Sequence, residues 1–232
     1  MISELFKDLF YLFYPITCCN CNSNLSRNEF VLCVPCRHDL PYSHYTKHKN
    51  NPIETLFFGR IPVQAATSLF LFSQKGMGQK LIHQLKYQGK ENIGKFAGFL
   101  LAEELIKSKR FQNLDCIIPV PLHRKKQQQR GYNQLTTFGK SLSETLKIPF
   151  KENLLIKTSS STTQTKKNKF DRWKNTIESF ELRDTTFLEN KHILLIDDVV
   201  TTGATIEACA HTLQQPKNAT LSIATIAHTI NF

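Results

Sequence analysis

The chain has 232 residues, 41% of them hydrophobic, and its 30 Lys and Arg against 19 Asp and Glu give a formal charge of +11. This composition excludes wholesale disorder, and the length suits one main domain with a small extra module. The positive charge favours polyanionic partners or phosphorylated substrates.

The first residues, MISELFKDLFYLFYPITCC, have neither the length of a membrane span nor the basic start of a signal peptide. The apolar run from Leu9 to Ile16 is far shorter than the ~20 residues that cross a bilayer, and Glu4 and Asp8 are acidic. Apolar residues instead recur at helical spacing, at Leu5, Phe6, Leu9, Phe10, Leu12 and Phe13. We expect a short amphipathic helix packed on the body of a cytoplasmic protein. Peripheral docking on a membrane or on a partner is the alternative.

Two C-x-x-C pairs follow, formed by Cys18 with Cys21 and by Cys33 with Cys36. Two such pairs place four thiolates around one zinc ion, and in so short a segment the metal would supply the folding energy. Disulfides and redox thiols are the alternatives. A cytoplasmic chain disfavours disulfides, and no thioredoxin-like pattern surrounds the pairs. Cys19 leaves an ambiguity, because it could replace a neighbour as ligand.

Residues 37–54 are polar with two prolines and predict a linker. We therefore assign residues 1–50 to the N-terminal helix, the zinc module and the linker, and residues 51–232 to the main domain.

In the main domain, apolar strands and helical patterns alternate. Strands are expected at 66–72, 114–121, 192–200 and 219–229, and helices at 78–90, 91–110, 133–148 and 204–215. Continuous apolar strands alternating with helices predict an α/β fold with a parallel sheet covered on both faces. Ligands of such sheets bind at the carboxyl ends of the strands.

The segment ILLIDDVVTTGAT, residues 193–205, combines two chemistries at such a strand end. Neighbouring carboxylates at Asp197 and Asp198 are strong acceptors for the vicinal hydroxyls of a sugar. A turn at Gly203 then leads into a helix, whose free N–H groups and nearby threonine hydroxyls would hold a phosphate. The combination predicts a site for a ribose that carries a 5-phosphate.

The segment has two alternative interpretations. ILLIDD also resembles the Walker B strand of an NTPase, but Gln134-LTTFGKS lacks the first glycine of a P-loop and lies within a helical pattern. A strand end with solvated acids is the structural alternative.

Residues 193–205 resemble the phosphoribosyl-pyrophosphate signature of type I phosphoribosyltransferases. This resemblance implies that Asp197 and Asp198 hold the ribose hydroxyls at the catalytic centre. It implies that the 5′-phosphate is bound by Thr201, Thr202, Gly203, Ala204 and Thr205.

A pyrophosphate leaving group needs cationic partners, with Mg²⁺ sharing its charge. Two basic loops qualify, at residues 119–134 and 157–175, and the second is long enough to be a lid or a disordered segment. Lys86, in LKYQGK, could reach the same site, although an exposed helix end explains it equally well. The candidate cationic residues are Lys86, His123, Arg124, Arg130 and Arg172.

The string P-V-P-L-x₇-R-G-Y-N-Q from Pro119, the later residues Gln164, Arg172, Asn175 and Phe180, and the front cysteine pairs together resemble the ComF family. The resemblance runs from about residue 5 to the C-terminus. It implies a zinc-binding front module, a type I phosphoribosyltransferase-like domain, and a role in natural transformation with single-stranded DNA and a helicase partner. Lys157 and Ser161 depart from the arginine and threonine that are usual there.

The sequence supports two hypotheses about function, one for an enzyme and one for a binding protein. The chain is either a Mg²⁺-dependent phosphoribosyltransferase of unknown acceptor, or a non-catalytic adaptor for single-stranded DNA or a helicase that keeps the ligand pocket as a sensor. The intact signature favours ligand binding in both.

Overall fold

The computed structural model describes residues 15–122, 132–158 and 180–230. Its centre is a four-stranded sheet of order β1-β6-β5-β2, in which every neighbouring pair is parallel. The strands are β1 (Ala65–Phe72), β2 (Cys116–Pro119), β5 (His192–Val200) and β6 (Thr220–Thr229). These are the four predicted strands, and β5 has the predicted bounds.

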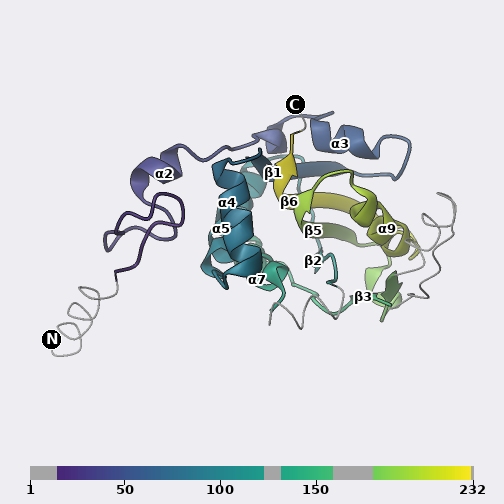
Figure 1. Cartoon of the computed structure of the whole chain (residues 1–232). Coiled ribbons are helices and arrows are strands. Elements are labelled where there is room, and N and C mark those ends of the chain that lie inside the picture. Colours follow the sequence, from purple (N-terminus) through teal and green to yellow (C-terminus); the bar gives the residue numbers. More distant parts are fainter. Residues whose placement is uncertain (1–14, 123–131, 159–179, 231–232) are drawn as a thin grey trace, which may run out of the picture.

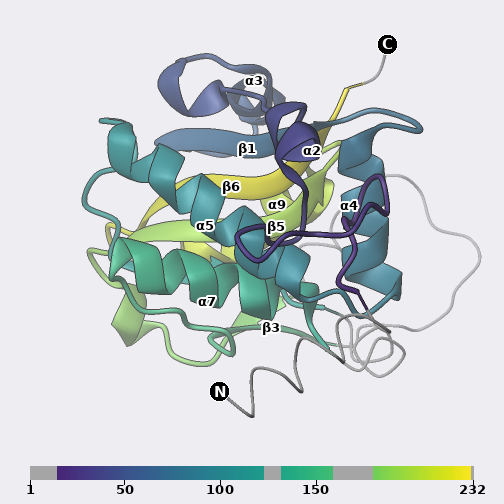
Figure 2. The same cartoon turned by 90° about the vertical axis from the view of Figure 1, so that its left-hand side faces the viewer.

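Helices cover both faces of this sheet, as the sequence pattern predicts. One face carries α4 (Met77–Tyr87), α5 (Asn92–Lys107) and α7 (Gln134–Leu146), and the other carries α9 (Ala204–Leu213) (Figure 1, Figure 2). The central strand β5 is therefore apolar without alternation, and Ile193 to Ile196 are fully buried. The predicted α/β class is confirmed.

Close packing between α5 and α7 fixes where α7 begins. A side chain on Gly98 of α5 would place its Cβ 2.6 Å from the carbonyl oxygen of Phe138 in α7, so only glycine allows this approach. Asn133 caps α7 by accepting a hydrogen bond from Leu135 N at 3.0 Å. The first residue of the helix, Gln134, is thereby held at the carboxyl end of the sheet.

Several short elements were not predicted, because they are too short to show a period. They are α2 (Val34–His38), the 3₁₀ helices η1 (Tyr45–Lys47) and η2 (Thr186–Leu188), α3 (Pro52–Phe57), and the antiparallel pair β3 (Leu155–Lys157) and β4 (Phe180–Leu182).

The segment predicted as a linker is instead bonded along the open edge of β1. Leu71 N donates to Pro41 O at 2.7 Å, and Ser43 N donates to Leu69 O at 2.9 Å. These bonds cover part of the strand edge, which would otherwise expose unpaired backbone groups. Residues 41–43 therefore belong structurally to the sheet.

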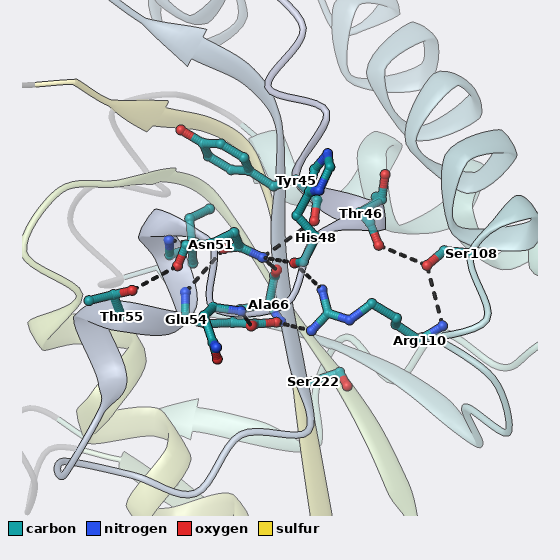
Figure 3. Close-up of polar contacts among 12 residues, drawn as sticks. Tyr45, Thr46, His48, Asn51, Glu54, Thr55, Ala66, Ser108, Arg110 and Ser222 are labelled. Carbon is teal, nitrogen blue, oxygen red and sulfur yellow. Dashed lines mark hydrogen bonds and ion pairs between the residues drawn. The ribbon is translucent and has the colours of Figure 1, made fainter.

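The start of α3 is fixed to the same edge by a buried polar network (Figure 3). Asn51 Oδ1 accepts from Ile53 N at 3.0 Å, while its Nδ2 donates to Ala66 O at 2.8 Å. Glu54 Oε1 accepts from Ala66 N at 3.0 Å and forms an ion pair with Arg110. Residues 51–54 of the segment predicted as a linker are thus bonded to β1 through side chains, which the local pattern does not show.

No helix in the described ranges is long and apolar enough to cross a membrane. Residues 1–14, where we expect the amphipathic helix, lie outside the described residues.

Candidate functional site

Three elements converge on Asp198 at the carboxyl end of β5. Lys86 Nζ, in the last turn of α4, lies 2.7 Å from Asp198 Oδ1. Gln134 Nε2 donates to Asp198 Oδ2 at 2.6 Å. Asp198 is only 7% exposed, so its charge is compensated inside the protein by one cation and one amide.

The neighbouring side chain, that of Asp197, leaves β5 on the other face, because successive residues of a strand alternate. Asp197 lies on the side of the sheet that α9 covers. The pKa of the Cys209 thiol in α9 is raised, first by burial and then by the charge of Asp197. Asp197 Oδ1 accepts a hydrogen bond from Asp198 N at 2.8 Å. Burial, followed by the charge of Asp198, raises the pKa of Asp197 to about 8.

Residues 201–203, which we call the phosphate loop, connect β5 to α9. Gly203 caps the helix with φ of +74°, a conformation that side-chain-bearing residues rarely adopt. Thr201, Thr202, Ala204 and Thr205 are exposed around it. Among the described residues, no side chain accepts a hydrogen bond from the first N–H groups of α9. An anion could therefore take these donors.

Two residues of this site escaped sequence reasoning, Gln134 and Arg60. Arg60, just after α3, donates from NH1 to Thr202 O at 3.0 Å and forms an ion pair with Glu207 in the first turn of α9. Gln134 ends the RGYNQ string that resembles the ComF family, so a signal was present, although the sequence assigned it no role in the site. Nothing local marks Arg60.

The predicted site residues divide into two groups. Lys86 contacts Asp198, Asp197 leaves β5 on the opposite face, and the phosphate loop follows the same strand. The remaining cationic candidates, His123, Arg124, Arg130 and Arg172, lie outside the described residues. The P-loop alternative is excluded, since Gln134 to Ser141 lie within α7.

The four cysteines of the C-x-x-C pairs form a separate cluster. The Sγ atoms of Cys18, Cys21, Cys33 and Cys36 all lie within 4.8 Å of one another. Zn–S bonds of about 2.3 Å in a tetrahedron imply sulfur separations of about 3.8 Å, which fits this cluster. Cys21 and Cys33, at 3.6 Å, are too far apart for a disulfide. All seven cysteines lie within the described residues, and each is free.

The surroundings of the cluster resemble those of a metal knuckle. Asn20 donates from its backbone N to Cys18 Sγ at 3.4 Å and from Nδ2 to Cys36 Sγ at 3.3 Å. Cys19 is not part of the cluster. Its thiol is buried, which raises its pKa, and its carbonyl accepts from Gln84 Nε2 of α4 at 2.6 Å. Cys19 therefore docks the module on α4.

Comparison with known proteins identifies a matching domain family and several relatives of this chain. Residues 136–229 match the model of the phosphoribosyl transferase domain. The chain is 26% identical over 212 residues to "Competence protein F" of Haemophilus influenzae, covering 88% of this chain and 93% of that protein. It is 30% identical over 153 residues to "DNA utilization protein YhgH" of Escherichia coli O157:H7, covering 65% of this chain and 66% of that protein.

Solved structures show distant similarity. An adenine phosphoribosyltransferase from Leishmania tarentolae aligns with a TM-score of 0.41 at 14% identity, over 68% of this chain and 90% of that one. A glutamine phosphoribosylpyrophosphate amidotransferase from B. subtilis aligns with a TM-score of 0.44 at 14% identity, over 62% and 30% of the two chains.

Proposed function

Because the chain belongs to the ComF family, we propose that it binds phosphoribosyl pyrophosphate with Mg²⁺ at the carboxyl end of β5. The observation that carries this proposal is the placement of Asp197 and Asp198 at the end of β5, a few residues before α9, whose first N–H groups have no side-chain acceptor among the described residues. Carboxylates suit the ribose hydroxyls, and the helix start suits the 5-phosphate.

Each part of the ligand has a group of suitable chemistry. The ribose hydroxyls bond to Asp197 and Asp198, and the 5-phosphate bonds to the N–H groups and hydroxyls of residues 201–205. The pyrophosphate lies toward Lys86. His123, Arg124, Arg130 and Arg172, which lie outside the described residues, are further candidate partners on the grounds of their charge alone. Asp198 is already neutralised by Lys86. Mg²⁺ therefore fits best as an ion that arrives with the phosphates of the ligand.

As an enzyme, the protein transfers the phosphoribosyl group. The bond between ribose C1 and the pyrophosphate oxygen breaks, and pyrophosphate leaves with the electron pair. The acceptor forms the new bond to C1 and loses a proton to solvent. Mg²⁺ supplies charge compensation for the departing pyrophosphate. The residues of the chain hold the ribose in place and stabilise the leaving group through cationic side chains.

The cysteine cluster is proposed as a structural zinc site with Cys18, Cys21, Cys33 and Cys36 as ligands. Four protein ligands leave no open position, which is typical of structural rather than catalytic zinc.

A second candidate function is an adaptor role in DNA handling during natural competence, with single-stranded DNA or a helicase as partner. The names of the H. influenzae and E. coli relatives support it, as does the formal charge of +11. In this case the same pocket serves as a sensor for the ligand without turnover.

Titration calorimetry tests the ligand proposal. The Asp197→Asn/Asp198→Asn variant keeps the shape of the site but replaces both carboxyl groups with amides, so its affinity for phosphoribosyl pyrophosphate should fall at least about tenfold. Arg130→Ala should weaken pyrophosphate binding and spare ribose 5-phosphate. Unchanged affinity in the double variant would contradict the assigned ribose site. A pyrophosphate-release assay with a panel of nucleobases then separates enzyme from sensor.

A further inference from the structure

The phosphate loop is held by a guanidinium that lies far away in the sequence. Arg60 NH1 donates to Thr202 O and to Leu56 O of α3, both at 3.0 Å. Arg60 NH2 pairs with the carboxylate of Glu207. One side chain thus joins α3, the phosphate loop and the first turn of α9.

The hydrogen bond from Arg60 to Thr202 O determines whether the oxygen or the N–H group of the Thr202–Gly203 peptide faces a ligand. In a trans peptide the C=O and N–H groups point in opposite directions, and no described peptide is cis. Because the Thr202 carbonyl points at Arg60, the Gly203 N–H points away from Arg60. If this peptide were turned over, its oxygen would face a bound phosphate and repel it.

The ion pair removes a second repulsion. Glu207 is 7% exposed and lies in the first turn of α9, where it competes with any bound anion for the positive helix end. Unpaired, its charge would also act on a phosphate through a poorly screening interior. Arg60 compensates this charge from the side of α3.

Arg60 can hold the loop because α3 is itself anchored. Its first turn is tied to β1 by Asn51, which donates to Ala66 O, and by Glu54, which accepts from Ala66 N (Figure 3). Phe57, at its end, lies under Gly203, where a Cβ would come 2.8 Å from the ring. The loop therefore rests on a helix bonded to the sheet.

We propose that Arg60 is a positioning residue for phosphate binding. It orients the Thr202–Gly203 peptide and neutralises Glu207, so that the start of α9 can accept the 5-phosphate. This inference rests on the proposed function and names a part of its site that contacts no ligand.

The matched control is Arg110, which forms a similar ion pair with Glu54 at the far end of the same helix. Arg110→Ala removes a buried Arg–Glu pair without touching the loop. Both variants are expected to lower the melting temperature, so stability alone does not distinguish them.

The first measurement is hydrogen exchange in the ligand-free protein. Glu207 N donates to Gly203 O at 2.9 Å, so its exchange rate reports whether Gly203 stays in place. We expect this amide to exchange about tenfold faster in Arg60→Ala. It should keep its rate in Arg110→Ala, relative to amides of β1. Equal rates in wild type and Arg60→Ala would overturn the inference.

The second measurement is calorimetry with ribose 5-phosphate. We expect Arg60→Ala to bind about tenfold more weakly, and Arg60→Ala/Glu207→Gln to recover part of the loss because the repelling charge is gone. Wild-type affinity in Arg60→Ala, or no recovery in the double variant, would overturn the electrostatic role. If wild type itself does not bind ribose 5-phosphate, the proposed function fails, and hydrogen exchange still decides whether Arg60 positions the loop.

Discussion

Lys86 and Asp198, 112 residues apart in the chain, form an ion pair of 2.7 Å at the carboxyl end of the parallel sheet. Their side chains are 20% and 10% exposed, so water screens this pair only weakly. The pair brings the end of α4 to the end of β5, and Gln134 adds a third element. The candidate site is therefore assembled across the sheet rather than along the signature alone.

This pair should contribute to stability. Lys86→Met leaves the carboxylate of Asp198 with only Gln134 and should lower the free energy of unfolding by ~2 kcal/mol, below the 3–5 kcal/mol of a fully buried pair. In an Asp198→Asn background, Lys86→Met should lower the free energy of unfolding by much less. Urea unfolding of wild type, both single variants and the double variant measures the coupling. Equal costs in the two backgrounds would mean that the pair is energetically neutral.

Asp197 should make stability depend on pH in an unusual direction. Its pKa is raised by burial and by Asp198, from 3.8 to about 8. The folded protein then binds more protons than the unfolded chain between these values. This site therefore lowers the free energy of unfolding as pH rises from about 4 to about 8.

Asp197→Asn should remove this decline. At pH 8 the free energy of unfolding of the variant should exceed that of wild type by on the order of 2 kcal/mol. This difference is smaller than the pKa shift alone would imply, because Asp197 keeps some solvent contact. The difference should vanish near pH 4. Urea unfolding across this range tests it, and a variant that is less stable at every pH would contradict the raised pKa.

The cysteine cluster should hold one zinc ion per chain. Cys36→Ser should lose the metal and loosen the module while the sheet domain stays folded. Cys19→Ser, outside the cluster, should retain the metal. Elemental analysis of the two purified variants and wild type decides this. Well under half an equivalent in wild type would exclude the site.

The basic surface should bind single-stranded DNA, given the formal charge of +11. Binding driven by phosphate contacts must weaken steeply with salt, by at least about tenfold between roughly 50 and 200 mM. Fluorescence anisotropy should show the largest loss for Lys126→Gln/Arg130→Gln. The control variant Lys107→Gln/Lys109→Gln removes equal charge next to α5. DNA affinity that does not change with salt, or an equal loss of affinity in both variants, would contradict this prediction. The DNA-related role would then depend on partner proteins.

The sequence alone was sufficient for the strands and long helices, for the grouping of four cysteines, and for the resemblance of residues 193–205 to a ribose-phosphate signature. Each of these features depends on residues that lie close together in the sequence. A buried parallel strand such as β5 is a continuous apolar run, helices repeat every 3.6 residues, and a metal knuckle needs only two closely spaced thiols.

The tertiary structure decided how the site is built. Alternation along β5 sends Asp197 and Asp198 to opposite faces, and the partners on each face depend on which helices cover it. Lys86 and Gln134 reach Asp198 because the end of α4 and the start of α7 lie at the carboxyl end of the sheet. Arg60, which follows α3, reaches Thr202 O after β5. Residues 37–54 have the composition of a linker because the bonds of Pro41, Ser43 and Asn51 to β1 are made with a strand that comes later in the chain. Such contacts depend on topology, and no local pattern records them.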